Sequence, residues 1–353
     1  MQAIKDFTTN SLNYIKYTLP VQAYELKTEL QTRTMALVNK ISDNIYPVNP
    51  VTHHRQIRLI PTSIEIGLGK IAYASLCPIS QRETKTETAN KVEEVFNNLK
   101  KQAICQDFPY EVSVIKDKHT INAFCVPGGK IAITTGLIEK LKEETTFKAS
   151  EEEQSQLEDV TFEDKLAAVL GHEIGHACAR HGATGLQLKI ALSLLVKVTS
   201  VALGYFIHKK GNAKLDNKTA TMPAAAVRAK RRQIDSRAGL IQSLVNLLGN
   251  FTTHLYTLKH SRCHEFEADK YGIKLAKKSG YNINGALWIQ HKFLQMKNEV
   301  EGKEKSKLEK TLELFATHPA SAERLVENRK TIQELHEEDE LLAFCGEPTS
   351  VQH

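Results

Sequence analysis

One stretch of sequence decides how the rest of this chain is interpreted, namely Leu170-Gly-His-Glu-Ile-Gly-His176. On an α-helix, residues i and i+4 lie only about 40° apart around the axis, so His172 and His176 share one face. Two imidazoles at this spacing can ligate one Zn²⁺ ion. Glu173 lies about 100° round from His172, where its carboxylate can take a proton from a metal-bound water without ligating the metal. The pattern indicates a catalytic metal; the alternative is a helix that merely carries two polar histidines on one face.

The residues around this motif strengthen the metal interpretation. Most residues from Leu166 to Ile174 are apolar, so the helix, expected from about Phe162 to Arg180, should be buried. Two histidines and a glutamate in a buried helix need a compensating partner, which a metal supplies. Residues 150–164 contain seven acids and no basic residue. They are expected to form a solvated loop before the positive end of the helix.

A catalytic zinc ion also needs a third protein ligand and one open position. His181 lies about 140° away from the ligand face on a continuous helix and is not expected to ligate. No glutamate occurs between His176 and Glu265, so Glu265 is the first candidate for a glutamate ligand from a second helix. His264 is its competitor, although a structural histidine is the ordinary interpretation of that residue.

Asp269 stands four residues after Glu265 and shares its helix face. Metal-ligating histidines usually donate their other N–H to a carboxylate, which fixes the tautomer and the ring orientation. Asp269 fits that supporting role. Glu267 is turned about 200° away from Glu265 and is expected at the surface.

The only convincing sheet signal lies before the motif. Residues 110–115 alternate like a strand, and Ile121–Val126 and Lys130–Thr134 flank Pro127-Gly-Gly129, which predicts a β-hairpin. The rest of the chain is mostly helical in pattern. The predicted fold class is therefore α+β and mainly helical, with a small antiparallel sheet or hairpin.

Composition narrows the class of protein without naming a partner. The 353 residues are 41% hydrophobic and 25% charged, as in ordinary globular proteins, and the content of Gly (18) and Pro (10) is low, which favours helix. A net charge of +6 is mild and by itself implies neither a nucleic-acid nor a membrane partner. The six cysteines form no CxxC pair, which favours a reducing compartment. The N-terminus has no apolar core of a signal peptide, so none is expected.

Two neighbouring segments stand out between His176 and Glu265. Residues 186–207 form the most apolar stretch, long enough for a bilayer span, but Lys189 and Lys197 interrupt it. A buried or interfacial helix and a single span both remain open. Residues 208–238 carry nine basic residues and two acids and are expected to form a mobile linker. This linker is either solvated or attracted to an anionic membrane surface.

Four blocks of sequence together resemble the gluzincin family of zinc metallopeptidases that includes the CAAX prenyl endopeptidases, HtpX and BepA. The blocks occur in the family's order and are Asn122–Leu137, Leu170–His181, Ser261–Gly272 and Thr317–Arg324. The resemblance spans roughly residues 58–330 and is strongest to the soluble or peripheral branch that contains the mitochondrial inner-membrane stress peptidase. It implies a zincin-type fold. The expected domains are an N-terminal extension (1–57), a peptidase domain (58–330) that contains the 186–207 and 208–238 insert, and a tail (331–353).

The resemblance also assigns roles to single residues. It implies one Zn²⁺ ion per chain, general-base catalysis by Glu173, and three zinc ligands: His172, His176 and Glu265. His318 would approach the metal, either to occupy the open position in a latent state or to assist the oxyanion; without the family, His318-Pro319 is only a plausible helix start. Arg324 would support the site, the alternative being a surface ion pair.

The hairpin at residues 121–135 would provide an edge strand beside the cleft. An extended substrate can add to such an edge through main-chain hydrogen bonds. Asn122 and Ala123 lie on this strand and are candidate substrate contacts.

The function implied is that of a zinc-dependent endopeptidase acting on proteins or peptides, with misfolded or membrane-associated proteins as expected substrates. The alternative is a zinc-stabilised chaperone or adaptor that binds unfolded chains without cutting, but such a protein has no need of Glu173. Anionic lipid is a further expected partner through residues 186–238, and nucleic acid is not favoured. The expected location is the cytoplasm or a membrane, peripherally or by one span, and no oligomeric state is indicated.

Overall fold

A computed structural model describes residues 19–216, 222–301, 318 and 322–344. The chain divides into two compact units, of which the first comprises residues 1–49 and 53–59. Its main element is helix α2 (Leu19–Ile45). After this helix, Arg55 donates hydrogen bonds to the side chain of Asp43 (3.2 Å) and to the carbonyl of Tyr46 (2.8 Å). These bonds tie the short turn after α2 back onto the end of the helix.

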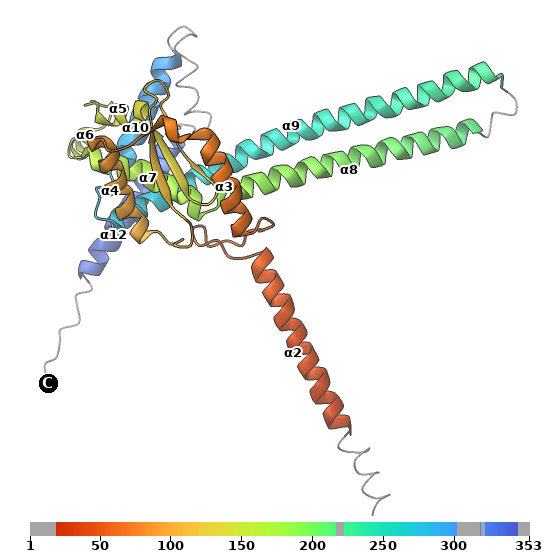
Figure 1. Cartoon of the computed structure of the whole chain (residues 1–353), viewed down its shortest axis with the longest axis horizontal. Helices are drawn as coiled ribbons and strands as arrows, with labels where there is room; N and C mark the ends of the chain where they lie inside the picture. The colour runs from red at the N-terminus through yellow and green to blue at the C-terminus, as the bar shows by residue number, and fades with distance from the viewer. Residues whose placement is uncertain (1–18, 217–221, 302–317, 319–321, 345–353) are drawn as a thin grey trace, which may run out of the picture. The chain divides into compact units, whose positions relative to one another are not determined.

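The second unit comprises residues 50–52 and 60–353 and contains the sheet and the remaining helices (Figure 1). The strands are β1 (Arg82–Glu83), β2 (Glu111–Ile115), β3 (Ala123–Val126) and β4 (Lys130–Thr134), preceded by the short 3-10 helix η2 (Ile79–Gln81). The α-helices are α3 (Thr62–Leu76), α4 (Glu87–Gln102), α5 (Thr135–Lys142), α6 (Glu151–Glu158), α7 (Phe162–Cys178), α8 (His181–Asp216), α9 (Ala224–Lys278), α10 (Gly285–Glu301) and α12 (Ala322–Phe344). The prediction of a mainly helical α+β fold is confirmed.

The sheet has the strand order β1-β2-β4-β3, so β3 lies at an edge. Strands β3 and β4 pair antiparallel, as the hairpin prediction required, with Ala123 opposite Ile133. Gly128 and Gly129 both adopt φ of 83°, a left-handed conformation that glycine adopts without strain. Strand β2 runs parallel to β4, so the sheet is mixed rather than purely antiparallel. Two parallel strands need a long connection between them. Here that connection runs from Ile115 to Lys130 and contains β3.

Helix α7 forms where the sequence predicted it. A capping box begins it, because Thr161 accepts a hydrogen bond from the backbone of Asp164 and its own backbone N–H donates to the Asp164 carboxylate. Leu166, Leu170 and Ile174 are fully buried in the main core. The acidic stretch before α7 is not simply a loop, since Glu151–Glu158 form α6. Its first-turn acids suit the positive end of that short helix.

The helix is interrupted immediately after α7. Arg180 adopts φ of 57°, which a helix cannot continue through, and α8 begins at the next residue. The Arg180 guanidinium forms an ion pair with the buried carboxylate of Glu65 on α3 and donates a hydrogen bond to the carbonyl of Ile60 (2.9 Å). These contacts anchor a conformation that is costly for a residue with a side chain.

The predicted linker at 208–238 is wrong for most of its length, because α8 and α9 extend through it as two long antiparallel helices that lie side by side (Figure 1). His208 contacts Asp235 (2.9 Å) and Arg231 contacts Asp216 (2.9 Å) across the pair. Pro223 is placed at the N-cap of α9, where it does not interrupt helical hydrogen bonding. Within the described residues, α8 is the one helix long and apolar enough to cross a membrane by length and composition.

Glycine allows α7 and α9 to touch backbone to backbone where they cross. A Cβ atom on Gly272 would lie 2.8 Å from the backbone nitrogen of His172, and one on Gly175 would lie 2.9 Å from the carbonyl oxygen of Ala268. Such distances leave no space for a side chain. The close crossing brings the histidines of α7 next to the acids of α9.

We expect Gly272→Ala to lower the free energy of unfolding by about 1–3 kcal/mol, because the added methyl forces the two helices apart. The measurement is urea unfolding of the metal-free protein followed by circular dichroism. Gly239→Ala in the same helix is the matched control, since a Cβ atom there meets nothing within 4 Å. That control should keep or raise stability, by up to about 1 kcal/mol. Equal effects of the two substitutions would contradict a tight crossing at Gly272.

Candidate metal centre

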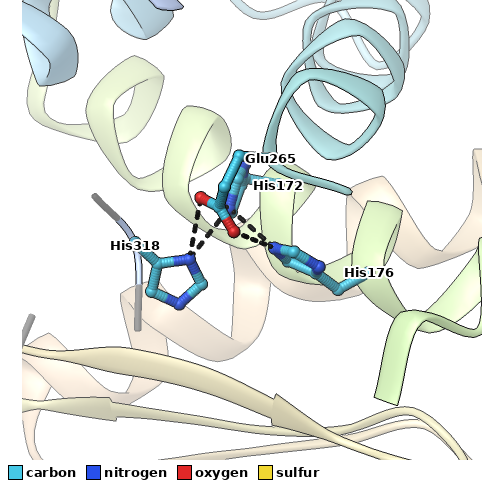
Figure 2. A group of neighbouring side chains, drawn as sticks. All are labelled: His172, His176, Glu265 and His318. Atoms are coloured by element: carbon cyan, nitrogen blue, oxygen red, sulfur yellow. Dashed lines mark hydrogen bonds and ion pairs between the residues drawn. The ribbon is translucent and has the colours of Figure 1, made fainter. Parts of the chain in front are cut away.

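Four side chains converge at the crossing of α7 and α9, three of them buried and one, His176, half-buried (Figure 2). His172 and His176 come from α7, Glu265 from α9, and His318 from the chain before α12. The Nε2 atoms of His172 and His176 are 3.0 Å apart. Glu265 places Oε2 3.4 Å from His172 Nε2 and Oε1 3.2 Å from His176 Nε2. The structure therefore brings together the three ligands that the resemblance implied.

The spacing of these atoms fits a tetrahedral ion. With ligand bonds of about 2.0–2.1 Å, neighbouring ligand atoms around a tetrahedral zinc ion lie roughly 3.3–3.4 Å apart. The distances among His172, His176 and Glu265 lie between 3.0 and 3.4 Å. Two imidazoles and one carboxylate are also donors that zinc accepts in catalytic sites. The side chains present thus match one divalent ion in both geometry and chemistry.

The charges of the site also favour a cation. Burial lowers the pKa of His176 to about 4, so its ring is neutral near pH 7 and has a lone pair to donate. Burial alone would lower the pKa of His172, but the carboxylates of Glu265 and Asp269 raise it to about 10. Burial likewise would raise the pKa of Glu265, yet His318 and His172 hold it well below its usual value. The site therefore contains a buried carboxylate that stays ionised and requires positive charge beside it.

His318 lies at the fourth corner of the cluster. Its Nδ1 is 3.2 Å from both His172 Nε2 and Glu265 Oε2, and its Nε2 is 3.4 Å from Oε1 of Glu173. Although burial alone would lower the pKa of His318, the charges of Glu265 and Glu173 raise it. This residue is close enough to the other donors to share an ion with them.

Glu173 follows His172 in α7 and is almost fully buried. It does not belong to the cluster of four donors. Its Oε2 atom makes no hydrogen bond within the part of the chain that the structure describes. A buried carboxylate oxygen without a partner is costly, and such groups are typical of functional sites.

Asp269 and Arg324 support the donors from behind. Asp269 Oδ1 lies 2.8 Å from His172 Nδ1. Arg324 donates two hydrogen bonds of 2.7 Å to the Asp269 carboxylate and approaches Glu265 Oε2 at 2.9 Å. Burial would raise the pKa of Asp269, but Arg324 and His172 lower it to about 2. Because Arg324 is only 4% exposed, the alternative of a surface ion pair is excluded.

The contacts that His176 makes on the side away from the other donors were not predicted from the sequence. Nδ1 of His181 lies 2.8 Å from Nδ1 of His176, and Nε2 of His181 lies 2.9 Å from Oε2 of Glu267. The ring of His264 stacks on His181, with centroids 3.9 Å apart. The expected 140° offset of His181 assumed a continuous helix, whereas the helix is broken at Arg180 and His181 lies next to His176. Glu267, expected at the surface, is half-buried and turned towards His181.

A pocket adjoins the cluster and is lined mainly by apolar side chains. Its lining includes Ala123 from the edge strand, His172, Glu173, Ile289 and Phe293. Ala123, a predicted substrate contact, is thus one of the residues that line this pocket. Asn122 is not among the lining residues; it is buried beside Thr134, whose hydroxyl accepts a hydrogen bond from its backbone N–H (3.0 Å).

Comparison with known proteins finds metalloproteases among the relatives of this chain. Metalloprotease LoiP of Escherichia coli is 27% identical over 240 residues, which cover 68% of this chain and 68% of that protein. Mitochondrial metalloendopeptidase OMA1 of Arabidopsis thaliana is 25% identical over 215 residues, or 61% of this chain and 30% of that protein. The matching OMA1 of Schizosaccharomyces pombe is 27% identical over 221 residues, which cover 62% of this chain and 45% of that protein. The chain therefore matches less than half of either OMA1 protein.

The model of peptidase family M48 matches residues 86–332, which is more than half of the chain. This range includes the edge strand, both ligand helices, His318 and Arg324. The relatives named above are metalloproteases and metalloendopeptidases, the class of enzyme that the sequence predicted. The chain belongs to peptidase family M48.

Proposed function

We propose that this chain is a zinc-dependent endopeptidase with one zinc ion per chain, ligated by His172, His176 and Glu265. The observation that carries the proposal is the near-tetrahedral spacing of these three donors beside a carboxylate oxygen of Glu173 that makes no hydrogen bond to any described residue. Metalloendopeptidase names among the relatives support the same reaction class. When bound in such a site, zinc lowers the pKa of a coordinated water to around 7 and polarises a carbonyl.

The residues of this chain supply the proton transfer and the positioning. Glu173 serves as the general base, since its carboxylate is buried next to the donors but does not belong to them. Asp269 holds the ring of His172 through Nδ1, so that Nε2 faces the metal. Arg324 neutralises Asp269 and Glu265 together and so keeps both carboxylates ionised in a buried place.

The substrate binds as an added strand along β3. Because Asn122 and Val126 accept hydrogen bonds from the β4 side, the alternation turns the main-chain groups of Ala123 and Cys125 away from β4. An extended peptide can pair with these groups with little demand on its sequence. Asn122 contributes by holding the start of the strand, and the apolar pocket beside Ala123 accepts one substrate side chain. Such a site suits unfolded segments of misfolded or membrane-associated proteins.

His318 holds the enzyme in a latent state. Its Nδ1 lies at the corner of the donor set where water or a substrate carbonyl must bind. Catalysis therefore requires His318 to move away from that corner. Assistance to the oxyanion, the other role that the family resemblance implies, would require it to remain.

We expect Glu173→Gln to retain zinc but to lose nearly all peptide-bond cleavage, because the amide cannot accept the proton. The measurement pairs metal analysis with a casein cleavage assay on the wild type and the variant. This substitution also separates the two classes of function: a chaperone or adaptor would bind unfolded chains equally well in both forms. Undiminished cleavage by Glu173→Gln would refute the assigned base.

We expect His318→Ala to raise the rate of peptide cleavage, because the fourth corner becomes available, while zinc content stays at one ion per chain. The measurement is the initial rate of cleavage of a fluorogenic peptide at matched zinc content. A fall in rate with zinc retained would instead support the oxyanion role.

An anionic membrane surface is the second proposed partner, through helices α8 and α9. Exposed apolar side chains follow one face of α8 at helical spacing, namely Leu194, Val198, Val201 and Tyr205, each 57–66% exposed. A buried core helix does not leave such a stripe outside. Basic residues gather where α8 ends and α9 begins, namely Lys209, Lys210, Lys214, Arg228, Lys230, Arg231 and Arg232. Apolar contact beside basic charge is typical of segments that bind anionic lipid.

We expect the double substitution Val198→Asp/Val201→Asp to abolish flotation of the protein with vesicles that contain phosphatidylglycerol, because it places charge in the apolar face. Added salt should weaken binding of the wild type, and vesicles of phosphatidylcholine alone should bind less. Ile79→Asp is the control, because Ile79 is 82% exposed but lies outside the two helices. Wild-type protein that ignores both kinds of vesicle would contradict the proposal.

A further inference from the structure

The two ring nitrogens of His176 face different partners. Nε2 lies among the metal donors, 3.0 Å from His172 Nε2 and 3.2 Å from Glu265 Oε1. Nδ1 faces the other way and lies 2.8 Å from Nδ1 of His181. His181 in turn places Nε2 2.9 Å from a carboxylate oxygen of Glu267. An unbroken series of hydrogen-bonding distances thus leads from the metal centre to the half-buried carboxylate.

The protons in this series depend on one another. A neutral imidazole carries one N–H, and two ring nitrogens at 2.8 Å need one proton between them. For Nε2 of His176 to offer a lone pair to the metal, its proton must be on Nδ1, which then donates to Nδ1 of His181. His181 must then carry its own proton on Nε2 and donate it to Glu267. Every contact in this order has one donor and one acceptor.

As long as His181 is neutral, Glu267 excludes the opposite order. If Nδ1 of His181 donated to His176, then Nε2 of His181 would point a lone pair at the Glu267 carboxylate, 2.9 Å away. An ionised carboxylate only accepts hydrogen bonds, so that contact would be repulsive. The proton of His176 would also move to Nε2, into the donor set. The carboxylate at the far end therefore selects the tautomer of a ring that it does not touch.

Burial and stacking hold this arrangement in place. The side chain of His181 is 4% exposed, and the parallel ring of His264 covers one of its faces. Water competes poorly for hydrogen bonds in such surroundings, which strengthens the series. The ring of His264 is thus a packing surface for His181.

We propose that His181 and Glu267 are positioning residues that lock His176 in its metal-ligating tautomer and so set the affinity of the centre for zinc. The inference rests on the proposed role of His176 as a ligand. A carboxylate then orients each of the two histidine ligands. Asp269 contacts His172 directly, and Glu267 acts on His176 through the imidazole of His181. Both carboxylates come from the same helix as Glu265.

The alternative is that His181, His264 and Glu267 bind a second metal ion. Ligand atoms of His181, His264 and Glu267 lie within 4.8 Å of one another. A metal on Nε2 of His181 would force the proton of that ring onto Nδ1, the order that takes His176 out of the first centre. The hydrogen-bond distances at both nitrogens of His181 favour the positioning role.

The experiment measures zinc affinity of the full-length protein, stripped of metal and titrated with zinc against a chromophoric chelator near neutral pH. His181→Phe keeps a ring but removes both nitrogens and should weaken zinc binding roughly 10–100-fold. His181→Asn should recover most of this loss, because its amide oxygen can accept the proton of His176 in place of Nδ1. Glu267→Gln should give a smaller loss, since the amide can present either an acceptor or a donor. His264→Phe is the matched control and should bind zinc like the wild type.

Circular dichroism of the metal-free variants shows whether each is folded, and the loss of affinity in Glu267→Gln provides the measurement if His181→Phe is not. Equal losses in His181→Phe and His264→Phe would overturn the inference in favour of packing. Two zinc ions per wild-type chain, reduced to one by His181→Phe, would overturn it in favour of a second metal site. Unchanged affinity in His181→Phe would overturn it outright. Wild-type protein that takes up no zinc would refute the metal centre itself, a result distinct from the other three.

Discussion

The backbone contact between α7 and α9 is the constraint on which the rest of the structure depends. At this crossing, Gly272 approaches the backbone of His172 and Gly175 approaches Ala268 so closely that no side chain fits between them. The positions of the donors on α7 and α9 then follow from helical periodicity. The histidines of α7 and the acids of α9 project from helices held at a fixed, short separation. The α7 side of the contact is continuous with the main hydrophobic core through Leu170 and Ile174, so the donors are held as firmly as the core.

Such closeness concentrates charge in a place with little water. Glu265 and Asp269 are both ionised and buried, which is stable only beside positive charge. Arg324 provides part of it by contacting both carboxylates, and the remainder must come from a cation or from protonated histidine. The electrostatic demand of the site and its proposed chemistry therefore have one origin, the packing of two acids against the histidine helix.

The centre of the site could be predicted because its signals are local. His172 and His176 share a helix turn, as do Glu265 and Asp269, so helical geometry alone places each pair on one face. The hairpin was equally evident from Pro127-Gly-Gly129 between two apolar stretches. The pairing of Arg324 with Asp269 spans 55 positions, and no local pattern distinguishes it from a surface ion pair. The contact of His181 with His176 was not predicted, because a single residue, Arg180, leaves the helical conformation, where it forms an ion pair with Glu65 on α3. The helices through 208–238 were missed because a high density of like charge resembles a linker, while the pairing of α8 with α9 stabilises helix there.

The insertion of the α8 and α9 pair between His176 and Glu265 has a consequence for how this chain can vary. The two ends of the α8–α9 pair are held together by the glycine contact between α7 and α9. The outer part of the pair is not needed to bring these ends together. The two helices pair with each other, as the contacts His208–Asp235 and Arg231–Asp216 show, and these contacts lie away from the crossing. Whole helical turns can therefore be gained or lost at the far end of the pair without moving the donors. The outer part of the α8–α9 pair can therefore vary in length, whereas the crossing of α7 and α9 has no space even for the methyl group of an alanine at position 272.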